Sequence, residues 1–181
     1  MILFFGPPGS GKSVQGQLLV ERNGWKWLST GQLFRDSKDP EMLERLSTGE
    51  LIDDELTNKI VNEALGGVDT DNNVILDGYP RNLAQAKWLE DHLPKHGREI
   101  QAIIAFDTPE DELVKRLSGR GRTEDSPAVI EKRLRIYHQN TKPILDYYRE
   151  QGTNVISING LGEVNEVHER IQEAVEKCIP A

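Results

Sequence analysis

The chain reads GPPGSGKS over residues 6–13, and this stretch decides the fold. It follows an apolar run, residues 1–5, and precedes a segment with helical spacing, residues 14–22. A strand, a glycine-rich loop and a helix in this order are the setting in which G-x-x-x-x-G-K-[ST] forms a phosphate-binding loop. The alternative is a plain Gly/Pro-rich turn. We predict a nucleoside triphosphate site, because the whole pattern is matched in the setting that it requires.

The residue types of this loop suit a bound phosphate. Glycines let successive backbone N–H groups point inward, which a Cβ would obstruct, and the helix that opens at Lys12 adds the positive end of its dipole. The Lys12 ammonium would reach the β- and γ-phosphates, and the Ser13 hydroxyl is placed for Mg²⁺. The loop therefore predicts both an anion site and a magnesium ligand.

Length and composition fit one globular domain. Of the 181 residues, 36% are hydrophobic and 29% are charged, a balance typical of a folded chain. The net charge of −8 argues against extended nucleic-acid or anionic-membrane surfaces as partners. The one cysteine, Cys178, forms no disulfide within the chain, and no apolar run reaches membrane-spanning length. We expect a cytoplasmic protein without nucleic-acid or membrane partners.

Short apolar runs alternate with longer amphipathic stretches along the chain. The expected strands are residues 2–5, 25–28, 74–76, 100–106 and 155–158, and the expected helices are residues 13–22, 31–36, 40–46, 54–65, 83–92, 109–117, 127–150 and 164–177. Strands separated by helices imply right-handed βαβ crossovers and a parallel sheet. The predicted fold class is α/β, with three α/β/α layers around a five-stranded parallel sheet.

Two interruptions stand out in this alternation. Residues 29–65 hold more helical pieces than a simple crossover needs, which predicts an inserted helical lobe. Residues 118–122, SGRGR, predict a short basic loop before the longest helix. Both could arch over the carboxyl ends of the strands, where open α/β sheets bind ligands. We expect one domain over residues 1–181, with residues 29–65 and 118–126 as inserts.

Charged residues follow the expected strands. Asp77 ends a buried strand, a position from which a carboxylate holds Mg²⁺ beside a phosphate loop, directly or through water; taken alone it is equally a β-turn Asp-Gly. The arginines near expected loops are Arg35, Arg81, Arg116, Arg120, Arg122 and Arg133. Arg133 taken alone is equally a surface residue on a helix flank. Together they predict a site for more phosphates than one nucleotide carries, because phosphoryl transfer depends on positioning and charge.

Five motifs, in order and spacing across nearly the whole chain, resemble the adenylate kinase family. They are GPPGSGK (6–12), LSTGQLFR (28–35), GELIDDE (49–55), DGYPR (77–81) followed by Gln85, and KRL (132–134). The resemblance implies a P-loop sheet core, a monophosphate-binding lobe over residues 29–65, a lid, and the reaction Mg²⁺ATP + AMP ⇌ 2 ADP. It also implies ATP, AMP and ADP as ligands, Mg²⁺ as cofactor and a monomer, while an oligomer stays open.

The same resemblance assigns roles to residues of this chain. Arg116 would lie against the ATP adenine, as a cation–π contact, and the Gly162 carbonyl would read that base. Asp77 would organise the water shell of the metal, beside Ser13. The implied catalytic residues are Lys12, Arg81, Arg120, Arg122 and Arg133. The implied ATP-binding residues are Gly9, Ser10, Gly11, Lys12, Ser13, Val14, Arg116, Arg120 and Gly162. The implied AMP-binding residues are Thr30, Gly31, Arg35, Glu50, Leu51, Ile52, Gly78, Tyr79, Pro80, Arg81, Gln85, Arg122 and Arg133.

The acceptor base is predicted from Gln85, four residues after Arg81 and hence one helical turn on, facing the same pocket. A carboxamide both donates and accepts, so it pairs with the amino group and the adjacent ring nitrogen of adenine. UMP/CMP kinases resemble this chain but have Asn at this position and usually Ala at the position of Thr30. The alternative is that Gln85 and Thr30 are ordinary helix-surface and cap residues. Both side chains favour AMP.

The sequence departs from the family pattern in the lid and around the phosphates. Gly121 alone separates Arg120 from Arg122, so the lid is nearly absent, and no cysteine cluster is present for the zinc of some lids. Loss of the lid predicts either ATP hydrolysis without AMP or a neighbouring subunit over the site. Glu124-Asp125 occupies the paired aspartates, Gln32 replaces an aspartate, and Ser13-Val14 replaces Gly-Thr.

Three functions remain open at this point. Adenylate kinase is the leading hypothesis, another monophosphate kinase for UMP, CMP or dAMP is the nearest rival, and a nucleotide-binding protein with weak ATPase activity is the third. Gln85 and Thr30 argue against the second. The third leaves Arg35, Arg81 and Gln85 without a purpose. We therefore expect an active kinase.

Overall fold

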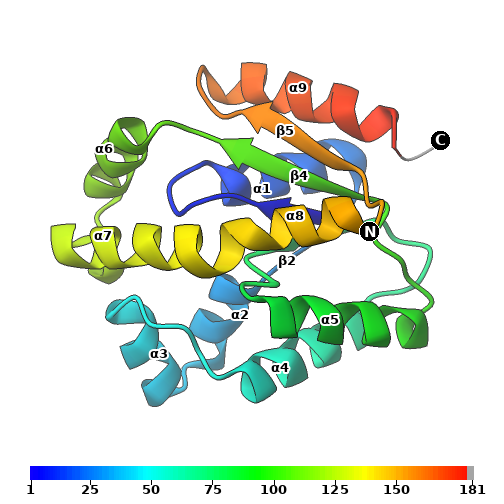
Figure 1. Ribbon diagram of the computed structural model, residues 1–181, viewed down its shortest axis with the longest axis horizontal. Coiled ribbons are helices and arrows are strands. Elements are labelled where there is room, and N and C mark those ends of the chain that lie inside the picture. The colour runs from blue at the N-terminus through cyan, green and yellow to red at the C-terminus, as the bar shows by residue number, and fades with distance from the viewer. Residues whose placement is uncertain (179–181) are drawn as a thin grey trace.

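The computed structural model describes residues 1–178, so the last three residues of the expected domain lie outside the described residues (Figure 1). Its strands are β1 (Ile2–Phe5), β2 (Lys26–Ser29), β3 (Val74–Asp77), β4 (Ala102–Asp107) and β5 (Val155–Asn159). They form one parallel sheet in the order β2-β3-β1-β4-β5. The predicted α/β class with a five-stranded parallel sheet is confirmed.

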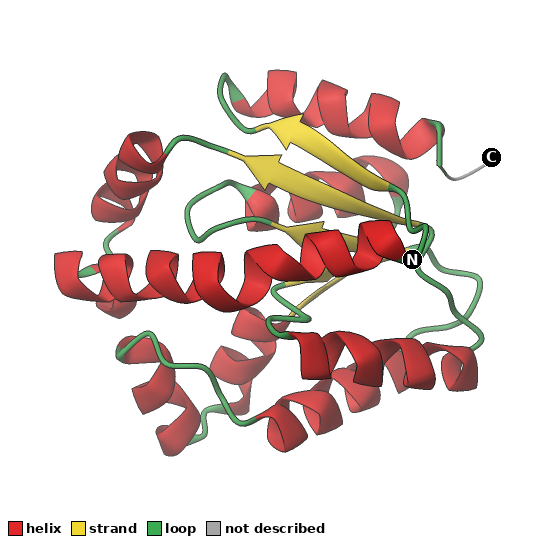
Figure 2. Ribbon diagram, viewed as in Figure 1, coloured by secondary structure: helices red, strands yellow, loops and turns green. Residues whose placement is uncertain are grey.

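Helices separate the strands and cover both faces of the sheet (Figure 2). They are α1 (Lys12–Asn23), α2 (Thr30–Ser37), α3 (Pro40–Ser47), α4 (Asp54–Gly66), α5 (Leu83–His92), α6 (Glu110–Arg120), α7 (Pro127–Ile136), α8 (Lys142–Glu150) and α9 (Val164–Glu176). Two 3₁₀ turns, Leu93–His96 and Thr123–Asp125, and a π-helical turn, Tyr137–Thr141, join some of them. None of these helices is long and apolar enough to cross a membrane.

The central strand β1 shows why the run of apolar residues is continuous. Successive side chains of a strand point to opposite faces, and a parallel sheet covered on both sides buries all of them. Leu3 and Phe5 pack in a core with residues of α4, α5 and α8. Ile2 and Phe4 pack in a second core with residues of α1 and α9. The sheet is therefore the middle layer of three.

The connection before α7 differs from the expected loop. Residues 118–120 belong to the last turn of α6, which ends at Gly121 with a φ of 73°. A glycine in this left-handed conformation is a common helix stop. Only Gly121 and Arg122 then separate α6 from the 3₁₀ turn at Thr123–Asp125. The loop is shorter than the predicted residues 118–122, because α6 continues to Arg120 and ends at Gly121.

The predicted helix over residues 127–150 is one rod in Figure 2 but not one uniform α-helix. The π-helical turn Tyr137–Thr141 lies between α7 and α8, and the Lys142 N–H bonds the Tyr137 carbonyl five residues back. Pro143 follows at the start of α8, and a proline ring clashes with the carbonyl four residues earlier. A wider turn accommodates such a clash.

Buried apolar side chains between the sheet and α5 hold the layers together, which predicts a contrast within one helix. Leu89 is 0% exposed and Leu83 is 44% exposed, both on α5. We expect Leu89→Ala to lower the free energy of unfolding by about 3 kcal/mol, because it leaves a cavity in the core, and Leu83→Ala to lower it by less than about 1 kcal/mol. Urea unfolding followed by circular dichroism measures both; equal losses would contradict this packing.

Candidate active site

One cavity of about 570 Å³ gathers most of the predicted site residues at the carboxyl ends of the strands. Of the predicted residues, those that line it are Gly9, Ser10, Gly11, Lys12, Ser13, Val14, Gly31, Arg35, Glu50, Leu51, Asp77, Gly78, Tyr79, Pro80, Arg81, Arg116, Arg120, Arg122, Arg133 and Gly162. Thr30, Ile52 and Gln85 do not line it. Residues that are far apart in the sequence thus share one hollow.

The glycine-rich loop after β1 binds the side chain of Lys12 through its backbone carbonyl groups. The Lys12 Nζ donates to the carbonyl oxygens of Gly6 at 2.8 Å and Pro7 at 2.9 Å. Gly9 has a φ of 85°, and a Cβ there would lie 2.9 Å from the side chain of Leu117. Burial lowers the pKa of Lys12 to about 8, against the opposing pull of the Asp77 carboxylate. The amine is therefore pre-positioned at the loop that is predicted to bind phosphate.

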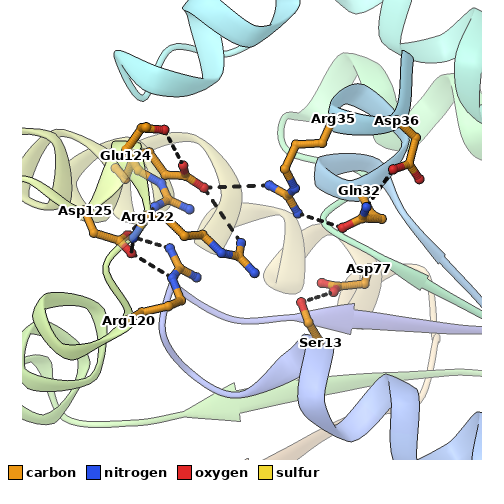
Figure 3. Close-up of polar contacts among 11 residues, drawn as sticks. Ser13, Gln32, Arg35, Asp36, Asp77, Arg120, Arg122, Glu124 and Asp125 are labelled. Atoms are coloured by element: carbon orange, nitrogen blue, oxygen red, sulfur yellow. Dashed lines mark hydrogen bonds and ion pairs between the residues drawn. The ribbon is translucent and has the colours of Figure 1, made fainter. Parts of the chain in front are cut away.

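Ser13 and Asp77 meet where β3 ends beside the start of α1. The Ser13 Oγ donates to Asp77 Oδ2 at 3.0 Å, and Asp77 is 3% exposed (Figure 3). A hydroxyl and a carboxylate are the oxygen ligands that Mg²⁺ prefers. The two side chains therefore fit the predicted magnesium site. No group of three or more His, Cys, Asp or Glu side chains placed to hold a metal occurs within residues 1–178.

Two carboxylates, Glu124 and Asp125, gather arginines from separate elements (Figure 3). Asp125 accepts from Arg120 at 2.8 and 2.5 Å and from the Arg122 backbone N–H at 3.1 Å. Glu124 Oε1 lies 3.7 Å from both Arg35 of α2 and Arg122. The sequence predicted that these arginines form one site; it did not indicate that this carboxylate pair joins them.

Comparison with known proteins agrees with this geometry. The sequence model of the adenylate kinase family matches residues 4–153. The chain belongs to the adenylate kinase family. It is 41% identical over 169 residues to the adenylate kinase of Mycolicibacterium paratuberculosis, covering 90% of this chain and 93% of that protein. It is 38% identical over 182 residues to that of Mycobacterium tuberculosis, covering 97% and 99% of the two chains.

A third adenylate kinase, from Mycolicibacterium vanbaalenii, is 40% identical over 180 residues, which cover 96% of this chain and 98% of that protein. The resemblance predicted from five motifs is therefore confirmed over nearly the full length. These similarities establish the family.

In this family member, Arg133 and Arg81 add positive charge deep in the cavity. Burial, together with the neighbouring charges of Arg81 and Arg120, lowers the pKa of Arg133 to about 10. Its Nη1 is buried without a hydrogen-bond partner in the described part of the chain, 3.6 Å from Asp125. Burial likewise lowers the pKa of Arg81. A donor that is desolvated and unpartnered beside other cations marks a place for an anion.

Arg116 lies at the other end of the cavity, held on two sides. Its Nε donates to Glu112 Oε1 at 2.8 Å and its Nη2 donates to the Gly160 carbonyl at 3.0 Å. Gly160 precedes the turn that contains Gly162, which has a φ of 111°. The guanidinium is thus fixed beside that turn. This placement agrees with the predicted adenine contact, which stays a prediction.

Gln85 does not line the cavity, although the sequence predicted that it would face this pocket. It is 2% exposed; its Oε1 accepts from the Arg81 N–H at 2.7 Å, and its Nε2 donates to Asp54 Oδ1 at 2.8 Å. Asp54 also accepts from the Asn82 amide at 2.9 Å. The prediction that Gln85 lies near Arg81 is correct. The Gln85 amide group is bound by Asp54 of α4, behind the residues that line the cavity. Its role toward AMP stays a prediction.

Thr30 and Ile52 are the other predicted residues outside the cavity lining. Thr30 is 0% exposed and donates to the Gly78 carbonyl at 2.9 Å. Ile52 packs with Phe34 and Met42 in a small apolar cluster. Both support the wall rather than form its surface. Asp54 and Glu112 are site residues that the sequence reasoning missed, since each acts by holding another side chain.

The lowered pKa of Lys12 predicts a pH-dependent stability. Its folded pKa is about 8 against an ordinary value of 10.5, so between these values the unfolded chain binds more protons and stability rises with pH. From pH 7.5 to 9.0 we expect this group to add about 1 kcal/mol to the free energy of unfolding. Urea unfolding of the wild type and Lys12→Met at both pH values measures the difference. The same pH dependence in both proteins would contradict it.

Proposed function

We propose that this chain is an adenylate kinase that transfers the γ-phosphoryl group of Mg²⁺-bound ATP to AMP and yields two ADP. The observation that carries the proposal is the single cavity that holds both a phosphate-binding loop and five arginines, Arg35, Arg81, Arg120, Arg122 and Arg133. One triphosphate does not need so many cations. Two phosphorylated substrates that meet end to end do.

For ATP, we assign the phosphates to the loop over residues 9–13 and its Lys12 ammonium. The Lys12 Nζ lies on the loop carbonyls at 2.8 and 2.9 Å and would exchange them for phosphate oxygens. A phosphate nearby favours the charged amine, so binding raises the pKa of Lys12 from its lowered value of about 8. Arg116, which is fixed beside the Gly160–Gly162 turn, is assigned to the adenine ring.

For the acceptor, we assign the AMP phosphate to Arg35, Arg81 and Arg122, and the transferred group to Arg120, Arg133 and again Arg122. Catalysis then consists of aligning the two phosphates and spreading positive charge over the oxygens of the group in flight. Arg133 brings a buried, unpartnered Nη1 to that point. The AMP oxygen attacks as the bond to the leaving ADP breaks, so no protein nucleophile is needed.

Mg²⁺ is assigned to Ser13 and Asp77, whose oxygens lie 3.0 Å apart at the loop. When held by these two side chains, the ion would neutralise part of the charge on the phosphates. The chain's own part is to hold the carboxylate, 3% exposed, in a fixed direction through the Ser13 hydroxyl.

We also assign residues 29–65 to the monophosphate-binding lobe and residues 118–126 to a minimal lid. The helices between β2 and β3 share a small apolar cluster of their own, built around Phe34, Met42 and Ile52. That cluster would let the lobe move as a unit over the acceptor. The single cysteine supports the cytoplasmic location that we assign to the chain.

A substrate panel tests the proposal. We expect ADP to form from ATP and Mg²⁺ when AMP is added, and to form at a far lower rate with UMP, CMP, GMP or no acceptor; a chelator should stop the reaction. A coupled assay for ADP measures each rate. If the rate is highest with UMP or CMP, that monophosphate is the acceptor in place of AMP. Equal slow ADP release with or without any acceptor would favour a nucleotide-binding protein with weak ATPase activity.

Gln85→Asn tests the reading of the acceptor base. The shorter amide can no longer bridge from Asp54 to the adenine edge, so we expect kcat/KM for AMP to fall about 10- to 100-fold while the affinity for ATP is unchanged. Gln151→Asn, at an exposed position after α8, is the matched control. Steady-state kinetics and the melting temperature are measured on both. An unchanged kcat/KM for AMP would remove Gln85 from base recognition.

A further inference from the structure

Glu124 lies between two arginines that the proposed function assigns to the acceptor. Its Oε1 is 3.7 Å from Arg35 Nη1 on α2 and 3.7 Å from Arg122 Nη1 after α6 (Figure 3). Its other oxygen, Oε2, accepts from the Thr123 hydroxyl at 3.2 Å. One carboxylate oxygen therefore faces two cations, as an oxygen of a bound phosphate would.

The surroundings of Arg35 leave Glu124 as its charged partner within residues 1–178. Gln32 accepts from Arg35 Nη2 at a long 3.4 Å, and Asp36 is engaged by the Gln32 amide at 2.8 Å instead. Glu124 itself is 8% exposed, so water screens its charge only partly. Burial lowers the pKa of Arg35, with Arg122 adding to the fall and Glu124 opposing it.

The length of the Glu124 side chain matters for this contact. Asp125, the next residue, reaches Arg120 and Arg133 but makes no ion pair with Arg35. A glutamate extends about 1.5 Å further than an aspartate. The longer arm lets Glu124 bridge from the α6–α7 connection to α2 on the opposite wall of the cavity. An aspartate at this position would fall short of one of the two arginines.

We propose that Glu124 is a positioning residue that occupies the place of the acceptor's phosphate, and that it releases Arg35 when the monophosphate binds. The inference rests on the proposed function, because it takes Arg35 and Arg122 as acceptor ligands. A phosphate dianion that approaches Arg35 meets a carboxylate already paired with it, and like charges at this distance repel. Glu124 thus keeps the arginines together and weakens acceptor binding at the same time.

Titration calorimetry with AMP tests the inference on the full chain. We expect Glu124→Gln to bind AMP about fivefold more tightly than the wild type, because a competing charge is removed, with a lower kcat, because Arg122 loses its partner. ATP affinity should not change. A merely structural role predicts the opposite, weaker AMP binding together with a lower melting temperature. AMP binding by Glu124→Gln that is equal to or weaker than that of the wild type overturns the inference.

Two further variants complete the test. Glu124→Asp keeps the charge but has a shorter side chain, so we expect it to bind AMP more tightly than the wild type and to retain kcat. If Glu124→Gln does not fold, this variant tests the inference in its place. Unchanged or weaker AMP binding by Glu124→Asp overturns the inference. Glu131→Gln is the control, since it removes an exposed carboxylate that pairs with Arg135 on α7.

The outcome also separates this inference from the proposed function. If the wild type binds AMP and the Glu124 variants do not differ from it, the inference fails and the kinase assignment stands. If the wild type prefers UMP or CMP, the same titrations with that monophosphate test Glu124, because the phosphate is the same. If the wild type binds no monophosphate, both are overturned.

Discussion

Mutual repulsion among cations is the constraint on which the site depends. Lys12, Arg81 and Arg133 lie half-buried near one another, and the loss of hydration lowers the pKa of each. A fold that gathers such charges needs carboxylates at the same place, and Asp77 and Asp125 supply them, 3% and 9% exposed. Because the positive charge exceeds what these groups neutralise, the cavity favours polyanions. The same cluster of cations thus lowers the stability of the fold and favours the binding of phosphates.

The sheet makes this arrangement achievable. β1 lies between β3 and β4, so the glycine-rich loop and Asp77 emerge at the same edge. The hydrogen bond from Ser13 to Asp77 spans 64 positions of sequence but only one strand spacing. Arg35 lies on α2, Arg120 on the last turn of α6 and Arg133 on α7. Arg81 and Arg122 lie in the connections that follow β3 and α6. The parallel topology therefore brings the two ends of the proposed reaction together without any long loop.

The sequence predicted those features that a local pattern or a complete motif specifies. Apolar runs located the strands, and the match over residues 6–13 located the loop, because glycine spacing and the following lysine are fixed by phosphate geometry. Side chains whose placement depends on distant partners were not predictable. The position of Gln85 is set by Asp54 on another helix. The helix expected to end at residue 117 continues to Arg120, where Gly121 ends it.

The short connection between α6 and α7 changes how such a site is completed. A long lid excludes water and delivers arginines as it closes. Here Arg120 lies on the last turn of α6, and Asp125 accepts from it at 2.8 and 2.5 Å, so this proposed site residue is already held in place by a neighbouring side chain. Preassembled charge lowers the reorganisation that catalysis requires. Across the cavity, Arg35 of α2 and Glu124 join the two walls, with 3.7 Å between Nη1 and Oε1.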